Sequence, residues 1–194
     1  MEAHLSQYFP LLKPTPDHVV LDFGANEGWF SYALGRLGAR VVGFEPNFDA
    51  FCIARERCEK MRGVTIVNAA VGPKSGLTEL YFPPDYPLAP EIFSGSASTM
   101  PSNVEVDTSS GVSVFQIGVE EILDAFPHIY FLKIDIEGGE QELWSSLCAN
   151  SNKIEFLAIE THERLFSDED TFVAEAQQFI DEHDLGQRWT LSWP

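Results

Sequence analysis

The chain has 194 residues, of which 44% are hydrophobic and 22% are charged, as is usual for one globular domain with a buried core. Its formal net charge of −18 at pH 7 repels phosphate groups, which excludes nucleic acids and anionic membrane surfaces as favoured partners. The cysteines are few, no apolar run is long enough to span a membrane, and the first residues lack a signal-peptide pattern. These features predict a cytoplasmic protein with reduced thiols.

Strands and helices are expected to alternate along most of the chain, after a short lead over residues 1–17. Hydrophobic patterns predict strands at 18–23, 40–45 and 64–71, separated by amphipathic helices at 29–37 and 48–61. The second half continues with a helix at 119–126, a strand at 129–137, a helix from Glu140, a strand at 155–160, a helix from Ser167 and an edge strand at 188–193. This alternation predicts an α/β fold with a doubly wound, mainly parallel sheet covered by helices on both faces.

The alternation is interrupted by residues 83–111, which are rich in proline and serine. Short β segments flank this stretch at 76–82 and 112–117. A loop of this length inside a compact domain is usually functional, so we expect a flexible loop on the substrate side. Because the sequence contains no repeat and no linker between domains, the whole chain, residues 1–194, is predicted to be a single domain.

The first predicted strand runs into the turn DFGANEG, residues 22–28. Ligands of parallel α/β sheets lie outside the carboxyl ends of the strands, so this turn is a candidate ligand site. A dinucleotide fingerprint needs glycine where Asn26 and Trp29 stand, and the phosphate-loop motif is absent. The turn therefore argues against an NAD-dependent oxidoreductase and predicts a ligand without a pyrophosphate.

An acidic residue ends the second predicted strand. Glu45 lies roughly 20 residues beyond the glycine turn, where a carboxylate can accept both hydroxyls of a ribose. Asp22 adds a second carboxylate, which suits a ligand with an ammonium group. A nucleoside that lacks a diphosphate and carries a cationic amino-acid tail is S-adenosyl-L-methionine, which we take as the predicted cofactor.

The stretch FLKIDIEGGEQELW, residues 131–144, places charged residues in and after a predicted central strand. Strand alternation would put Lys133, Asp135 and Glu137 on one side. A strand covered on both faces buries such charges only with partners or beside a wet cleft. We therefore interpret Lys133 as a paired structural charge, and Asp135 and Glu137 as residues of the site.

The strand at 155–160 ends close to His162, which could reach the same cleft. His162 is a candidate for accepting a hydroxyl proton, with an ordinary surface histidine as the alternative. Asp135, Glu160 and His162 could together hold a hard cation. We nevertheless expect no metal, because carboxylates often gather at neighbouring strand ends without one. The H-E-x-x-H motif that begins at His162 is also incomplete, since Phe166 replaces its second histidine.

Four segments in order carry a resemblance to a known family: VLDFGANEGWFS (20–31), VVGFEPN (41–47), VNAAVGPKSG (67–76) and LKIDIEGGE (132–140). With these segments the chain resembles the FkbM-type family of S-adenosylmethionine-dependent methyltransferases over most of its length. The resemblance implies a class I methyltransferase sheet of the Rossmann-like type. It also implies methyl transfer to an oxygen, often on a sugar, a glycan or a natural-product intermediate.

The resemblance further implies roles for single residues. The methionine part of the cofactor would be lined by Asp22, Gly24, Asn26 and Gly28, the ribose would be held by Glu45, and the adenine would lie near Asn68 and Ala70. Asp135 and Glu137 would face the acceptor. The stretch after the last predicted helix has room for one strand instead of the usual terminal hairpin. We therefore expect a sheet that lacks its last strand, a truncated chain, or an edge completed by a partner such as a second copy.

The sequence thus predicts O-methylation of a hydroxyl on a small molecule, sugar or glycan. Asp135, Glu137 and His162 are the candidate catalytic residues, and Asp135, or His162 acting through it, would remove the hydroxyl proton. An acceptor that is already ionised would need neither. The alternative is a methyltransferase-like domain that binds a cofactor or partner without catalysis.

Overall fold

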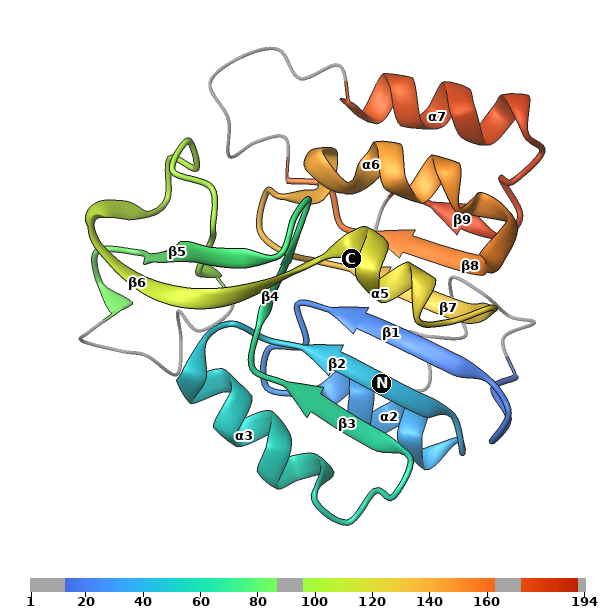
Figure 1. Cartoon of the computed structure of the whole chain (residues 1–194), viewed down its shortest axis with the longest axis horizontal. Coiled ribbons are helices and arrows are strands. Elements are labelled where there is room, and N and C mark those ends of the chain that lie inside the picture. Colours follow the sequence, from blue (N-terminus) through green and yellow to red (C-terminus); the bar gives the residue numbers. More distant parts are fainter. Residues whose placement is uncertain (1–12, 87–95, 163–171, 192–194) are drawn as a thin grey trace.

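The computed structural model describes residues 13–86, 96–162 and 172–191, and its centre is a six-stranded sheet (Figure 1). The strands are β1 (Val19–Phe23), β2 (Arg40–Phe44), β3 (Val64–Val67), β7 (Ile129–Ile134), β8 (Ile154–Ile159) and β9 (Trp189–Thr190). They follow the order β3-β2-β1-β7-β8-β9, and every neighbouring pair is parallel. The strand order reverses between β1 and β7, which is where sheets of this kind bind ligands. The predicted doubly wound α/β fold is confirmed.

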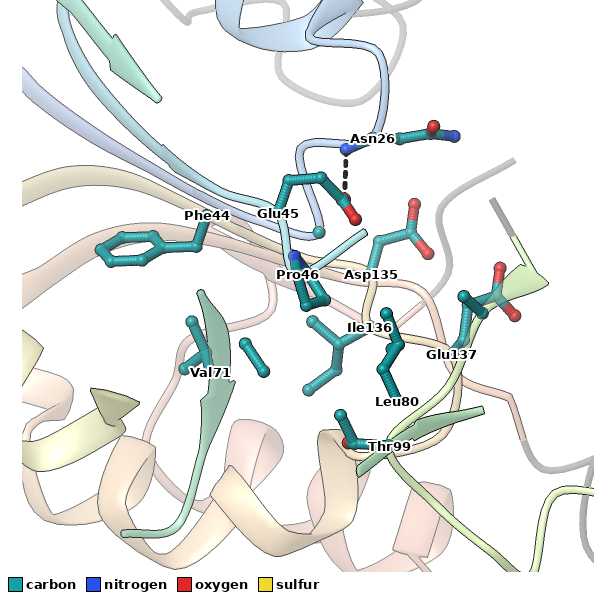
Figure 2. Close-up of a pocket in the computed structure, with 13 residues that line it drawn as sticks. Asn26, Phe44, Glu45, Pro46, Val71, Leu80, Thr99, Asp135, Ile136 and Glu137 are labelled. Carbon is teal, nitrogen blue, oxygen red and sulfur yellow. Dashed lines mark hydrogen bonds between the residues drawn. The ribbon is translucent and has the colours of Figure 1, made fainter. Parts of the chain in front are cut away.

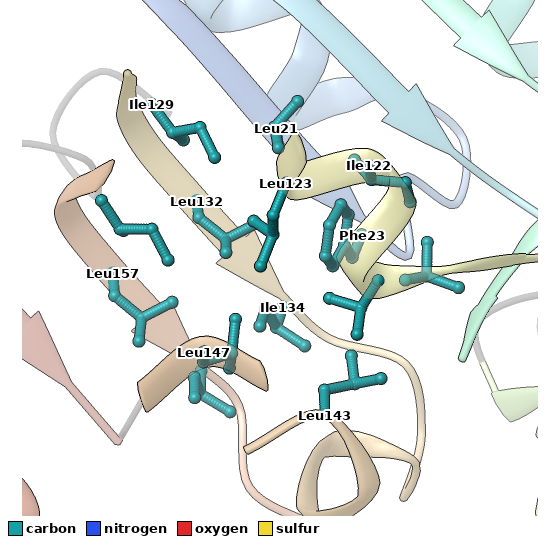
Figure 3. Close-up of a cluster of buried hydrophobic side chains, with 14 of the residues drawn as sticks. Leu21, Phe23, Ile122, Leu123, Ile129, Leu132, Ile134, Leu143, Leu147 and Leu157 are labelled. Carbon is teal, nitrogen blue, oxygen red and sulfur yellow. The ribbon is translucent and has the colours of Figure 1, made fainter. Parts of the chain in front are cut away.

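Successive residues of a strand point to opposite faces of the sheet. Because these residues are apolar on both faces, helices cover both. The helices are α2 (Trp29–Arg36), α3 (Phe48–Cys58), α5 (Val119–Asp124), α6 (Glu140–Ala149) and α7 (Phe172–Glu182). Leu21 and Phe23 belong to a core cluster with apolar residues of α5, α6 and α7, part of which is shown in Figure 3. Val20, which lies between them, packs in a second cluster with Leu34 of α2. In the described part of the chain, no helix has the length and apolarity needed to cross a bilayer.

The strand predicted at 64–71 is wrong in its extent, because the chain leaves the main sheet after Val67. The next residues form β4 (Ala70–Gly72), which pairs with β6 (Asp107–Gly118) in a separate three-stranded sheet whose third strand is β5 (Gly76–Phe82). The break falls at Asn68, whose side-chain amide donates hydrogen bonds to the backbone carbonyls of Glu45 and Pro46. These bonds tie the end of β3 to the end of β2.

The segment between β5 and β6 is shorter than predicted, since β6 already begins at Asp107. Ser98 forms a β-bridge with Tyr81, so this segment lies against the small sheet. Residues 87–95 are outside the described residues, and the flexibility expected of the 83–111 loop stays a prediction. The expected helix start at Ser167 also lies outside the described residues.

Two further boundaries bear on the site. The strand predicted at 129–137 ends at Ile134, so Asp135 and Glu137 lie in the loop that follows and are not placed by strand alternation. The predicted edge strand at 188–193 is present in part as β9 (Trp189–Thr190), which pairs in parallel with β8; residues 192 and 193 lie outside the described residues.

Candidate functional site

A cavity opens at the switch point, between the carboxyl ends of β1, β2 and β7 and the small sheet (Figure 2). Its volume is about 50 Å³, and its lining includes six of the residues predicted for the site: Gly24, Asn26, Glu45, Ala70, Asp135 and Glu137. A larger cavity of about 570 Å³ shares Pro46 and Leu80 with it and is lined by Asn68. The larger cavity falls in the size range of small-molecule sites.

The turn after β1 combines three residues in the left-handed region. Gly24, Asn26 and Gly28 have φ angles of 77°, 47° and 76°, which explains the Gly-x-Asn-x-Gly spacing because asparagine tolerates this conformation better than most residues. At Gly24 an added Cβ would lie 1.7 Å from the carbonyl oxygen of Asp135. Gly24 therefore allows the turn and the loop after β7 to meet. Gly28 packs against Ala54 of α3 and does not line either cavity.

Glu45 is held in place before any ligand arrives. Its side chain is buried, and Oε2 accepts a hydrogen bond from the backbone N–H of Asn26 at 2.7 Å while Oε1 accepts one from Asn47 at 2.8 Å. Burial raises the pKa of this carboxyl to about 7, although both backbone hydrogen bonds oppose that shift. A carboxylate that has used two of its lone-pair positions can still accept two hydroxyl groups.

Asp22 lies beneath the cavity and does not form part of its wall. It is fully buried, accepts a hydrogen bond from the hydroxyl of Ser31 at 2.6 Å, and faces the ammonium of Lys133 at 3.5 Å. The same ammonium contacts Oδ2 of Asp135 at 3.1 Å and donates to the carbonyl of Gly24 at 2.9 Å. The predicted pairing of Lys133 is therefore present, and its structural role stays a prediction.

The electrostatics of this pair follow from burial. Burial lowers the pKa of Lys133, but the nearby carboxylates of Asp22 and Asp135 outweigh it, so the net shift is upward and the ammonium stays charged. For Asp22, burial raises the pKa and the Lys133 charge opposes the rise. Within the described residues Asp22 thus faces an ammonium of the protein itself, and its contact with a ligand ammonium stays a prediction.

Asp135 and Glu137 lie in the loop after β7, with side chains that are partly exposed. Glu137 adopts φ 58°, a left-handed conformation that is unfavourable for a residue with a side chain. The carbonyl of Glu137 accepts hydrogen bonds from the hydroxyl of Ser98 at 2.7 Å and from the amide of Asn103 at 3.3 Å. The segment between β5 and β6 thus holds this loop in its shape.

His162 lies behind these carboxylates and lines neither cavity. Nδ1 lies 3.0 Å from Oε1 of Glu140, and Nε2 lies 3.4 Å from Oε2 of Glu137. Burial lowers the pKa of His162, but the hydrogen bond and charge of Glu140, together with the other carboxylates, raise it to about 9. The surrounding carboxylates thus favour the protonated form of the imidazole, and the role of His162 as a proton acceptor stays a prediction.

Glu140 is a residue of this region that sequence reasoning missed. Besides its contact with His162, its Oε1 accepts hydrogen bonds from the backbone N–H groups of Ile136 and Gly138, at 3.1 and 3.3 Å. The available signal was its position in the first turn of a helix, directly after two glycines, where an acidic side chain can bind the preceding N–H groups.

These features define the class of protein. A parallel sheet whose switch point carries a glycine turn and acidic strand ends is a doubly wound α/β fold with a ligand site at the carboxyl edge of its strands. A family model described as the methyltransferase FkbM domain matches residues 22–188. The chain therefore belongs to the FkbM methyltransferase domain family, and the family resemblance found in the sequence is confirmed.

Two proteins of known identity are similar to the chain. Hexuronic acid methyltransferase AglP from Haloferax volcanii is 25% identical over 148 residues, covering 75% of this chain and 56% of the relative. The chain thus spans about half the length of this curated relative. A solved structure, precorrin-6y C5,15-methyltransferase from Geobacter metallireducens GS-15, aligns with 94% of this chain and 68% of its own, at 18% identity and a TM-score of 0.49.

Proposed function

We propose that this domain binds S-adenosyl-L-methionine and transfers its methyl group to a hydroxyl of a sugar, glycan or other small molecule. The observation that supports the proposal most is that Glu45, Asp135 and the turn after β1 border one cavity at the switch point. Membership of the FkbM family supports methyl transfer. The similarity to AglP, a hexuronic acid methyltransferase, favours a sugar acceptor.

The two cavities suggest how the cofactor would lie. The methionine end would occupy the smaller cavity beside Gly24 and Asn26, and the ribose hydroxyls would donate to the free lone pairs of Glu45. The adenine would then extend past Ala70 toward Asn68 and the larger cavity. That cavity is lined mostly by apolar side chains, including Phe82, which suits a flat aromatic ring.

The acceptor would approach from the side of Asp135 and Glu137. Its oxygen would attack the methyl carbon of a bound S-adenosyl-L-methionine, and the electron pair of the carbon–sulfur bond would stay on sulfur, which gives S-adenosyl-L-homocysteine. Holding the oxygen and the methyl group in line can supply up to about 7–11 kcal/mol of the barrier reduction. The hydroxyl proton would pass to Asp135, because this carboxylate borders the cavity while His162 does not.

Calorimetry on the isolated chain tests the cofactor. We expect S-adenosyl-L-homocysteine to bind and NAD not to bind, and binding of NAD alone would overturn the proposal. Incubation with S-adenosyl-L-methionine labelled on its methyl group, with hexuronic acid glycosides, neutral sugars and simple alcohols as acceptors, then tests transfer. Cofactor binding without transfer to any acceptor would instead support a binding domain without catalysis.

Asp135→Asn tests the chemical step. We expect the variant to bind S-adenosyl-L-homocysteine as the unaltered chain does, and its kcat to fall by about 10²–10⁴-fold, the usual contribution of a general base. Asp124→Asn is the control, because Asp124 is exposed and pairs with Lys153 away from both cavities. An unchanged kcat in Asp135→Asn would remove Asp135 from the mechanism.

A further inference from the structure

The buried imidazole of His162 faces a group of carboxylates. Its Nε2 lies 3.4 Å from Oε2 of Glu137 and 3.8 Å from Oδ1 of Asp135, and Oε1 of Glu160 follows at 3.9 Å. Each of these three distances exceeds the 2.7–3.2 Å of an ordinary N–H···O hydrogen bond. The His162 side chain is only 3% exposed, whereas the three carboxylates are 20–33% exposed, so the buried imidazole lies against carboxylates that solvent can reach.

The spacing of these atoms fits a coordination sphere. One ligand atom each from Asp135, Glu137 and His162 can be chosen so that all three lie within 4.8 Å of one another. Ligands bound at about 2.0–2.2 Å lie about 2.8–4.4 Å apart when the angle at the metal is between 90° and 180°. The distances from Nε2 to Oδ1 of Asp135 and Oε2 of Glu137, 3.8 and 3.4 Å, fall inside this range.

Glu140 orients the histidine as metal sites require. Its Oε1 lies 3.0 Å from Nδ1 of His162, and it also binds the backbone N–H groups of Ile136 and Gly138 in the loop that carries Asp135 and Glu137. A histidine ligand usually donates its second ring N–H to such a carboxylate, which fixes the tautomer and the ring plane. When Nδ1 donates to Glu140, a neutral ring presents its Nε2 lone pair to the carboxylates. A cation placed between them would satisfy all three groups.

We propose that Oδ1 of Asp135, Oε2 of Glu137 and Nε2 of His162 form a binding site for one first-row divalent cation, of which Mn²⁺ is the probe of choice. Two carboxylates and one imidazole are the mixed oxygen and nitrogen ligands that such ions accept. The site departs from the expectation that no metal is present, and it includes Glu137 where the sequence had suggested Glu160. Asp135 and Glu137 also line the smaller cavity, so a bound ion could take an oxygen of the acceptor as a further ligand. With the ion bound, Oδ1 of Asp135 is a ligand and Oδ2 faces Lys133, so the role of Asp135 as a base belongs to the ion-free site.

Titration of the full chain with Mn²⁺ alone, followed by calorimetry and electron paramagnetic resonance at about 0.15 M salt, tests the proposal. We expect one saturable ion per chain. Glu137→Gln and His162→Gln should each weaken binding at least tenfold. Glu140→Gln should weaken it by about 10–100-fold through loss of orientation. His128→Gln is the matched control, because His128 pairs with Glu155 at the same 3.4 Å but at the exposed surface, and it should leave binding unchanged.

Two results would overturn the site. The first is the absence of saturable binding, which would mean that a proton on Nε2 takes the place of the ion. The second is equal binding by the unaltered chain and the Glu137→Gln variant, which would mean that Mn²⁺ is held by the acidic surface in general.

Circular dichroism identifies a variant that fails to fold, and the partly exposed Glu137 provides the safer substitution. Because neither cofactor nor acceptor is present, failure here is distinguishable from failure of the proposed methyl transfer.

Discussion

The affinity of this domain for S-adenosyl-L-homocysteine should rise with pH through neutrality, because Glu45 must be ionised to accept both ribose hydroxyls. Burial holds the pKa of Glu45 at about 7 in the free protein, against an ordinary value of 4.5 for a glutamate side chain. If only the ionised form is competent to bind, the apparent dissociation constant equals the intrinsic one divided by the ionised fraction. That fraction is about 0.1 at pH 6 and about 0.9 at pH 8, so affinity should increase about tenfold, or about 1.4 kcal/mol.

Folding stability should move in the opposite direction. A carboxyl whose pKa is higher in the folded state binds more protons there, so its contribution to stability is fully present below pH 4.5 and is lost as pH rises to about 7. The two pKa values differ by an amount that corresponds to about 3 kcal/mol. Urea unfolding of the ligand-free chain at pH 5 and pH 8, compared with Glu45→Gln, isolates this contribution.

Calorimetry of S-adenosyl-L-homocysteine at pH 6, 7 and 8 is the decisive assay for the ribose role. Glu45→Gln should bind more weakly at pH 8, since its amide supplies a donor where Asn26 and Asn47 already donate, and its affinity should no longer follow the ionisation of residue 45. Any pH dependence due to the ligand's own amino group persists in the variant and can be subtracted. An identical slope in both proteins, or a flat profile in the unaltered chain, would refute the reasoning.

Two further substitutions test the framework beneath the cavity. In urea unfolding, Gly24→Ala should lower the free energy of unfolding by at least about 2 kcal/mol, because the new side chain combines a positive φ with a clash against the carbonyl of Asp135. The control is Gly76→Ala, whose added Cβ meets nothing within 4 Å. It should change the free energy of unfolding by less than about 0.5 kcal/mol. Lys133→Met should cost about 3–5 kcal/mol in the same assay, since it leaves Asp22 buried without its cation. Lys153→Met, which removes an ion pair to the exposed Asp124, should cost no more than about 1 kcal/mol, and equal losses in the two lysine variants would contradict the account of Lys133.

The sequence was sufficient for the sheet because apolar strands that alternate with helices leave few other arrangements. It also located the acidic positions around the cavity, since the carboxyl ends of neighbouring parallel strands meet at one edge. The end of β3 was not predictable in this way. The run from Val64 to Val71 is apolar on both sides of Asn68, and only the hydrogen bonds of Asn68 to the carbonyls of residues 45 and 46 reveal where the chain changes sheets.

The details of the site depend on tertiary contacts that no local pattern encodes. Strand alternation suggested that Asp135 and Glu137 share a face, but the left-handed conformation of Glu137 in the loop sets their positions instead. Asp22 was expected to meet a ligand ammonium, and its actual partner, Lys133, lies 111 positions away on the neighbouring strand. The surroundings of His162 likewise depend on Glu140, from the helix that follows that loop.

The ammonium of Lys133 touches the carbonyl of Gly24 and the carboxylate of Asp135 at the same time. A single side chain therefore anchors both the turn that would receive the methyl donor and the loop that would receive its recipient. The position of this one ammonium is thus shared by both sides of the proposed reaction site.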